Sequence, residues 1–325
     1  MVNNMYNSTA FKFQSSLHVP EDFPYALTHP DFPRRVTVEL TNHCNLNCSM
    51  CPRRFMTGPK GFMTGSLFTR IIDEMAEHPG TVLVPFFRGE ALLHPEFLTM
   101  IAYARPRVGS VQLATNATLM DSSIAQGLVD LEVDFVSFSI DSINPAIYGH
   151  VRKNGNLERV LGNIDYLCAA REKKKSNVPQ IQVSVVETED TSEGVRDFIH
   201  FWSEKVDRVR VYKEHSKDGN FGSLDGDGEE APSMLRKPCV KLFNDLVIYW
   251  NGEVALCNHD WNRIESLGSV EDCSIQQIWQ GETYELQRRA HMGIGEMEDL
   301  CKRCDHWEAY WRKGKLIGAL YENDL

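Results

Sequence analysis

Short apolar runs alternate with longer segments of helical period along most of the chain. Strands separated by helices pair in parallel through crossovers, so this alternation constrains the fold more than any other feature. The apolar runs span 35–40, 81–87, 110–114, 134–140, 181–186 and 208–212, and the helical segments span 66–77, 95–104, 121–131, 157–171 and 191–204. We therefore predict an α/β fold of six strand–helix units around a parallel sheet.

The charge and the cysteine content exclude several classes of protein. The 325 residues include 34 basic and 45 acidic side chains, a net charge of −11, which opposes general binding to nucleic acid or anionic membranes. Nine cysteines are too few for a disulfide scaffold. The chain lacks a signal-peptide pattern at its start, and no apolar run approaches the ~18 residues of a membrane span. We expect a reduced, cytoplasmic protein with no nucleic-acid or membrane partner.

The composition divides the chain into four segments. Residues 1–30 are predicted to form an irregular, proline-containing arm, and residues 31–213 hold the six strand–helix units. Residues 214–235 are polar and rich in glycine and aspartate, which indicates a linker or lid; the regular ligand spacing of a calcium loop is missing. Residues 236–325 form a compact segment that carries cysteines and tryptophans. The linker predicts a domain boundary between the second and fourth segments.

The strongest chemical signal is a group of three cysteines directly after the first strand. Cys44, Cys48 and Cys51 have the spacing C-x3-C-x2-C, so their thiolates share one centre. Zinc would need a fourth ligand, whereas a four-iron cube held by three cysteines keeps one iron open for a substrate or cofactor. Loops after the strands of a β/α barrel lie on the face where such folds place their chemistry. An accidental group or a zinc knuckle is the alternative.

This motif resembles that of the radical S-adenosylmethionine (SAM) enzymes, and a second segment supports the resemblance. Gly89 and Glu90 follow the second strand in a segment similar to the family's Gly-Gly-Glu-Pro, with Arg88 for the first glycine and Ala91 for the proline. The resemblance implies that this segment binds SAM and that Glu90 holds its amino group through a charge-assisted hydrogen bond. The two departures change the backbone freedom of the loop.

Three further segments at successive strand ends are similar to the same family. Asn116 lies in a segment resembling Thr-Asn-Gly-Thr, with Ala117 for the glycine; Ser139 ends the fourth strand; and Arg152 closes the turn 148–152. The resemblance implies that Asn116 belongs to the SAM site, that Ser139 contacts the ribose or methionine part, and that Arg152 pairs with the SAM carboxylate. Taken singly, such residues are more often caps or surface ion pairs. Their order along the chain makes them reinforce each other.

A second group of cysteines lies in the C-terminal segment. Cys239, Cys257, Cys301 and Cys304 can share a metal centre only if folding brings the first two to the close pair C-x2-C. Asn-Gly at 251–252 between two apolar runs predicts a β-hairpin, which would return Cys257 to Cys239. Four thiolates suit either a zinc ion or an iron–sulfur cube.

The spacing around these cysteines is similar to that of the SPASM auxiliary domain, which implies one auxiliary [4Fe-4S] cluster on the four thiolates. Zinc remains the alternative. The two resemblances together imply a partial (β/α)6 TIM-like barrel followed by a small iron–sulfur domain. Two cysteines are left over: Cys168 reads as a buried helix thiol, and Cys273, where a helix should start, is a candidate hydrogen-atom donor to a substrate radical.

The family resemblance also implies a reaction. A reduced [4Fe-4S] cluster, supplied with electrons by a reductant such as flavodoxin or ferredoxin, would cleave SAM to a 5'-deoxyadenosyl radical that abstracts hydrogen from the substrate. An arm of about 30 residues is shorter than an ordinary peptide-binding domain. We therefore expect a small polar metabolite (a sugar, aminocyclitol or nucleoside) and dehydrogenation, epimerisation or decarboxylation. The alternatives are a maturase of a ribosomally made peptide and a non-catalytic, metal-stabilised binding protein.

Overall fold

The structure is a computed structural model that describes residues 31–213, 236–262, 267–304, 306–307, 311–312 and 315–316. The expected N-terminal arm, 1–30, and the expected acidic linker, 214–235, lie outside the described residues. None of the helices in the described part of the chain is both long and apolar enough to cross a membrane.

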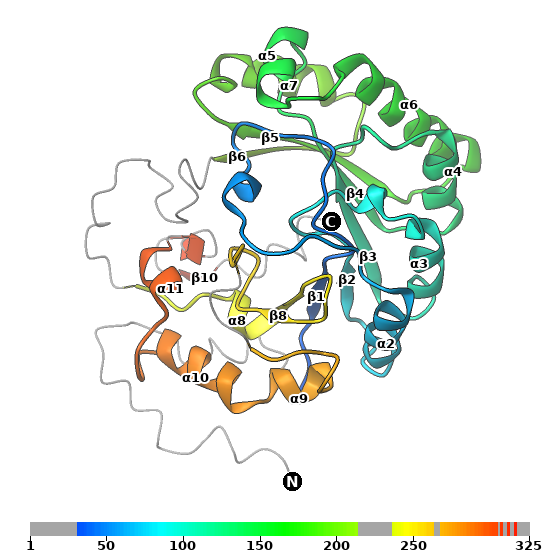
Figure 1. The fold of residues 1–325 in the computed structure, drawn as a ribbon. Helices are drawn as coiled ribbons and strands as arrows, with labels where there is room; N and C mark the ends of the chain where they lie inside the picture. The colour runs from blue at the N-terminus through cyan, green and yellow to red at the C-terminus, as the bar shows by residue number, and fades with distance from the viewer. Residues whose placement is uncertain are drawn as a thin grey trace.

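An open, curved sheet with helices along its outer side forms the body of the protein (Figure 1). All six predicted strands are present and pair in parallel with their neighbours in chain order. They are β1 (Arg35–Val38), β2 (Val82–Val84), β3 (Ser110–Thr115), β4 (Phe135–Ser139), β5 (Gln180–Glu187) and β6 (Arg208–Lys213). Parallel pairing through helical crossovers confirms the predicted α/β class and the partial barrel.

The crossover helices begin where short polar side chains cap their first turns. Thr64, Asp121 and Asn156 each accept a hydrogen bond from a backbone N–H three residues further on. The helices are α2 (Gly65–Ala76), α3 (Phe97–Ala104), α4 (Ser122–Asp130), α6 (Leu157–Lys174) and α7 (Val195–Trp202), with short 3-10 turns η1 (Pro52–Phe55), η2 (Ala91–Leu93) and η3 (Ser192–Gly194). The structure adds α5 (Pro145–Val151), which is too short to show a helical period in the sequence.

The C-terminal segment continues the same sheet. Helix α8 (Lys241–Asn244) leads into β7 (Asp245–Ile248), which pairs in parallel with β1, and β8 (Val254–Ala255) pairs with β7 in the predicted hairpin. Gly252 in the hairpin turn has φ +84°, a conformation that glycine adopts without strain. The strand order is therefore β6-β5-β4-β3-β2-β1-β7-β8, so the predicted hairpin extends the six-stranded parallel sheet by two strands.

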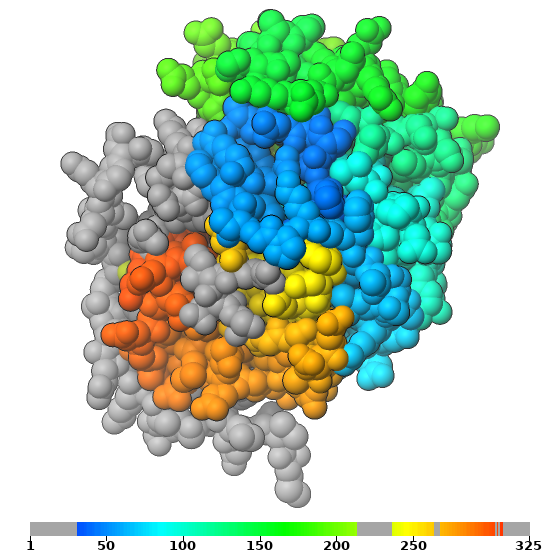
Figure 2. Space-filling view, in the orientation of Figure 1, coloured from blue at the N-terminus to red at the C-terminus, as the bar shows by residue number. Residues whose placement is uncertain are grey.

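The remaining C-terminal elements pack around this extension. They are α9 (Ile275–Trp279), α10 (Glu282–His291), α11 (Asp299–Arg303), β9 (Trp311–Arg312) and β10 (Lys315–Leu316). Buried side chains of β1, α2, β7 and α9 belong to one hydrophobic core. Figure 2 shows the C-terminal segment packed directly against the blue N-terminal part of the chain. The two predicted cysteine regions thus stand on one continuous framework.

Candidate active site

The first cysteine loop, which follows β1, forms one wall of a cavity of about 460 Å³. Cys44, Cys48 and Cys51 all line this cavity. The loop is held by backbone hydrogen bonds from Asn47 N–H to Lys153 O (3.1 Å) and from Ser49 N–H to Val151 O (2.9 Å). The end of α5 therefore fixes the cysteine loop against the barrel.

The three thiols suit a shared cluster better than a single ion. Burial raises the pKa of the Cys44 and Cys51 thiols, so a bound metal is needed to hold them as thiolates. Four ligands about 2.3 Å from one zinc ion would lie roughly 4 Å from each other. Among the described residues, no three His, Cys, Asp or Glu side chains converge in this way. A cube takes each thiolate on a different iron and needs wider spacing.

Gly89 allows the segment after β2 to pass against the backbone of the cysteine loop. A Cβ atom there would lie 2.2 Å from the carbonyl oxygen of Thr41 and 2.5 Å from that of His43, which no side chain permits. The close approach lets the Glu90 N–H donate to His43 O (2.8 Å). This contact sets Glu90 next to the cysteines.

The Glu90 carboxylate is buried and organised by three donors. It accepts hydrogen bonds from Thr115 Oγ1 (2.8 Å), Asn116 N–H (2.8 Å) and Leu92 N–H (3.2 Å). Burial raises the pKa of Glu90, partly offset by these hydrogen bonds. A bound ammonium group would further stabilise the charged carboxylate, and Glu90 lines the cavity where such a group would bind.

Asn116 and Ser139 both line the cavity, as the sequence predicts. The Asn116 side chain donates to Asn45 Oδ1 (3.0 Å) and approaches Cys44 Sγ (4.0 Å), so it braces the cysteine loop. Ala117, in the position that resembles a family glycine, has φ +62° and stays in the left-handed region. Replacing the glycine by alanine therefore leaves the turn conformation intact.

Arg152 lies at the end of α5, between the cysteine loop and an aspartate. Its Nε donates to Asp141 Oδ2 (2.5 Å), and its Nη1 lies 3.6 Å from Cys48 Sγ. Asp141 also accepts from Val186 N–H (2.8 Å) and has φ +69°. The sequence indicated Arg152 but assigned no function to Asp141, although the two are coupled through this ion pair.

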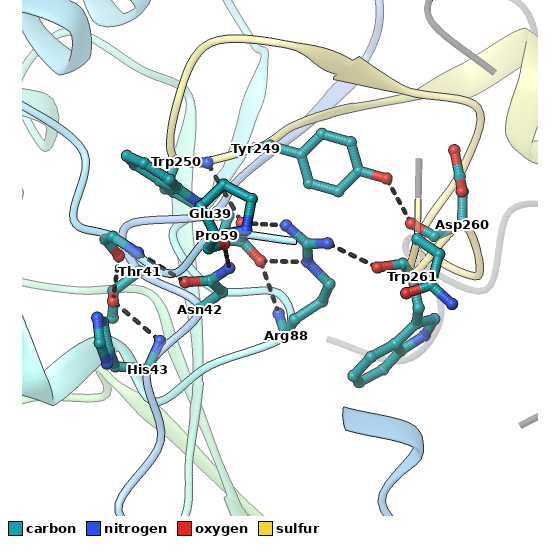
Figure 3. Close-up of polar contacts among 12 residues, drawn as sticks. Glu39, Thr41, Asn42, His43, Pro59, Arg88, Tyr249, Trp250, Asp260 and Trp261 are labelled. Carbon is teal, nitrogen blue, oxygen red and sulfur yellow. Dashed lines mark hydrogen bonds and ion pairs between the residues drawn. The ribbon is translucent and has the colours of Figure 1, made fainter. Parts of the chain in front are cut away.

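Arg88, the other departure from the family glycine, forms a buried network with the C-terminal segment (Figure 3). Its Nε and Nη2 bind the two carboxylate oxygens of Glu39 at 2.6 and 2.7 Å, and its Nη1 donates to Trp261 O at 2.7 Å. The guanidinium also lies 4.1 Å from the centre of the Tyr249 ring. The larger side chain thus ties the end of β1 to the loop after Cys257.

That loop, residues 257–262, contributes to the lining of the same cavity. Asn258, His259 and Trp261 line the cavity together with Lys241, whose ammonium donates to Asn258 Oδ1. The Asn262 side chain accepts from Thr57 N–H (2.9 Å) and donates to Phe55 O (3.3 Å). The loop after Cys257 is thereby fastened to the loop after Cys51.

The four C-terminal cysteines are brought together, as predicted from the hairpin. Burial, with mutual repulsion among the thiols, raises the pKa of Cys239 to about 11 and of Cys257 to about 12, and raises that of Cys301 as well. Cys304 acts electrostatically on the other three. Neutral thiols crowded in this way fit a metal centre that would hold them as thiolates.

Unpaired buried donors around these cysteines give a second test of the fit. Arg236 Nε and His291 Nε2 are buried and have no hydrogen-bond partner within the described parts of the chain. Buried donors are almost always paired, so an acceptor belongs in this region. The sulfurs of an iron–sulfur cluster are acceptors of this kind.

The two remaining cysteines lie elsewhere. Cys273 is exposed before α9, its carbonyl oxygen contacted by Arg70, and it does not line the cavity. The structure therefore does not bring this candidate hydrogen-atom donor to the site, and we assign it no function. Cys168 is partly buried on α6 and packs against the core, in line with a structural thiol.

Comparison with known proteins decides the family. Residues 38–198 match the radical SAM superfamily, and residues 239–305 match the iron–sulfur cluster-binding domain called SPASM. The tungsten-containing aldehyde ferredoxin oxidoreductase cofactor-modifying protein of Pyrococcus furiosus is 30% identical over 297 residues, covering 76% of this chain and 81% of its own length. The chain belongs to the radical SAM superfamily. The resemblances to the radical SAM family and to the SPASM domain are thereby confirmed.

Solved structures agree with this family in fold. BtrN in complex with AdoMet and 2-DOIA superposes with a TM-score of 0.57 at 18% identity, covering 87% of this chain and 96% of that one. Streptococcus suis SuiB bound to the precursor peptide SuiA gives 0.64 at 12% identity, covering 85% and 71%. As a radical SAM enzyme with a SPASM domain, the protein uses SAM with a [4Fe-4S] cluster and carries a further iron–sulfur cluster. Because the chain belongs to this family of enzymes, the alternative of a non-catalytic, metal-stabilised binding protein is wrong.

Proposed function

We propose that this radical SAM enzyme removes a hydrogen atom from a small polar metabolite, with dehydrogenation, epimerisation or decarboxylation as the net reaction. Cys44, Cys48 and Cys51 hold the SAM-binding cluster. When bound, this cluster supplies the electron that splits SAM into methionine and the 5'-deoxyadenosyl radical that attacks the substrate. The chain's own residues bind and orient SAM and the substrate and keep water away from them.

SAM is held at its amino acid end by two charged side chains. Glu90 binds the amino group, since its buried carboxylate lies on the cavity wall and is already oriented by three protein hydrogen bonds. Arg152 binds the carboxylate while Asp141 fixes the orientation of the guanidinium through Nε. Gly89 and Asn116 shape the loops around this end, and Ser139 contacts the ribose or methionine part.

The auxiliary cluster is held by Cys239, Cys257, Cys301 and Cys304. Their mutual electrostatic effects and raised pKa values support this assignment. Zinc fits less well, because no described set of ligands converges on a single-ion site. The domain boundary is proposed to fall within residues 214–235, although β7 contributes to the barrel sheet.

The observation that carries the proposal is the shared cavity. Its lining includes the first cysteine loop and Glu90, together with Asn258, His259 and Trp261 after Cys257. A volume of about 460 Å³ lies within the range of roughly 300–1,000 Å³ typical of small-molecule sites, and it must also admit part of SAM. This volume supports a small substrate, and Asn258, His259 and Trp261 offer it polar groups and an aromatic face.

The test is an anaerobic assay with SAM and dithionite. We expect a deuterated sugar, aminocyclitol or nucleoside to stimulate 5'-deoxyadenosine formation and to transfer deuterium into it. Stimulation by a ribosomal precursor peptide, with none by small metabolites, would replace the proposal by the peptide-maturase alternative. In the cell we propose a flavodoxin or ferredoxin as the reductant and the reducing cytoplasm as the compartment, with no nucleic-acid or membrane partner.

A further inference from the structure

His291, the last residue of α10, lies beside the auxiliary cysteines with one ring nitrogen unpaired. The residue is 1% exposed. Its Nδ1 accepts a hydrogen bond from the backbone N–H of Cys239 at 3.4 Å. Its Nε2 is buried and has no hydrogen-bond partner in the part of the chain that the structure describes. The ring is therefore fixed at one nitrogen and unsatisfied at the other.

The bonded nitrogen determines where the proton lies. An imidazole that accepts at Nδ1 carries its proton on Nε2 in the neutral form. Nε2 is thus an N–H donor, and a buried donor without an acceptor loses its hydration without compensation. The position calls for an acceptor that arrives with the cofactor.

Arg236 gives an independent sign of the same missing acceptor. Its Nη1 donates to the carbonyl oxygens of Cys304 (3.1 Å) and Lys302 (3.5 Å), which places the guanidinium at the C-x2-C pair. Its Nε is buried without a hydrogen-bond partner among the described residues, and its charge acts on both Cys239 and His291. Two unpaired donors therefore lie around the cysteines.

We propose that Nε2–H of His291 donates a hydrogen bond to a sulfur atom of the auxiliary iron–sulfur cluster and thereby raises its reduction potential. The inference rests on the proposed assignment of Cys239, Cys257, Cys301 and Cys304 to that cluster. Hydrogen bonds to the sulfurs stabilise the more negative, reduced form and are one of the factors that set the potential of such clusters. A higher potential makes the auxiliary cluster easier to reduce by one electron.

Two substitutions separate the two nitrogens of the ring. His291→Gln keeps an N–H donor near the position of Nε2, and His291→Asn keeps an acceptor near the position of Nδ1 and removes the distal donor. If the residue served only to accept from Cys239 N–H, His291→Asn would be the harmless change. The proposal requires instead that His291→Asn changes the potential of the auxiliary cluster and that His291→Gln leaves it nearly unchanged.

The readout is a redox titration followed by electron paramagnetic resonance on the anaerobically reconstituted full chain. In His291→Asn, the ratio of oxidised to reduced auxiliary cluster at a fixed potential should rise at least tenfold, which corresponds to 59 mV for one electron. In His291→Gln it should stay within threefold of the wild type. The SAM-binding cluster of the same sample is the internal control and should not move.

Three results would overturn the inference. They are an unchanged potential in His291→Asn, an equal shift in both variants, and a shift of both clusters together. If His291→Asn does not bind its auxiliary cluster, the proposal is tested by electron–nuclear double resonance of protein labelled with ¹⁵N-histidine. A weak ¹⁵N coupling to the reduced auxiliary cluster must then be present in the wild type and lost in His291→Gln. About four irons per chain in the wild type, in place of about eight, would instead refute the auxiliary-cluster assignment itself.

Discussion

Replacing Arg88 by methionine tests whether the buried ion pair holds the two cysteine regions together. The Glu39 side chain is fully buried and would lose its two short hydrogen bonds, from Nε at 2.6 Å and Nη2 at 2.7 Å. Within the described parts of the chain, only the longer backbone contacts from residue 88 (3.4 Å) and Trp250 (3.3 Å) would remain. Trp261 O would lose its arginine donor as well. Methionine preserves most of the side-chain volume, so charge and hydrogen bonding are the main changes.

The expected cost is large because one charge of a buried pair is left behind. Removing one partner of such a pair costs about 3–5 kcal/mol, whereas replacing both partners by uncharged groups is much less harmful. We therefore expect Arg88→Met to lower the free energy of unfolding by about 3–5 kcal/mol. Adding Glu39→Gln should recover roughly 1–3 kcal/mol of that loss, the size of coupling seen between residues in contact.

Thermal unfolding followed by circular dichroism measures this effect on anaerobically reconstituted protein of equal iron content. At roughly 2–4 °C per kcal/mol for a domain of a few hundred residues, Arg88→Met should lower the Tm by about 10 °C. All variants are heated at one scan rate, because unfolding of a cluster-containing protein is not expected to be reversible. A fall below about 3 °C, or a double variant no more stable than the single one, would refute the reasoning.

Three other predictions have equally definite expected outcomes. Cys257→Ala should lose about four irons per chain and still form 5'-deoxyadenosine, whereas Cys48→Ala should abolish that product; iron analysis and the cleavage assay check both. SAM affinity should weaken as the pH falls through the raised pKa of Glu90, because protonation removes the charge that binds the amino group. Glu90→Gln should bind SAM about 10–100-fold more weakly and should lack this pH dependence. Equilibrium binding measurements check both outcomes. Gly89→Ala should lower the free energy of unfolding by about 1–3 kcal/mol, because its Cβ would meet backbone oxygens. Gly149→Ala, which has open space around it on α5, is the control and should raise the free energy of unfolding by about 0.5–1 kcal/mol. Tm measurements compare the two variants.

The barrel and the loops of the SAM site were predictable because their signals are local. A strand covered on both faces is a continuous apolar run, and most cavity-lining residues of the SAM site lie at a strand end or a few positions after it; Arg152, at the end of α5, is the exception. Gly89 and Glu90, Asn116 and Ser139 could therefore be found one strand end at a time. The hairpin at Gly252 was visible for the same reason, as a short turn between two apolar runs.

The contacts between distant parts of the chain were not predictable in this way. Nothing near Arg88 indicates that its partners are Glu39, directly after β1, and the backbone of Trp261. His291 lies in an amphipathic helix, and the sequence alone does not distinguish it from the other polar residues of that helix. Such interactions depend on how elements pack, and a single sequence carries no direct record of packing.

The pairing of β7 with β1 affects how the protein can be divided. Arg35 to Val38 run in register with Asp245 to Ile248, so the first barrel strand is an inner strand of the sheet. A fragment ending before residue 236 would leave its backbone groups as an unpaired, apolar edge, the kind of surface that joins with other chains and aggregates. The cluster-binding segment from residue 236 onward therefore also completes the barrel sheet. Exchanging it between enzymes requires a replacement that brings a strand to pair with β1.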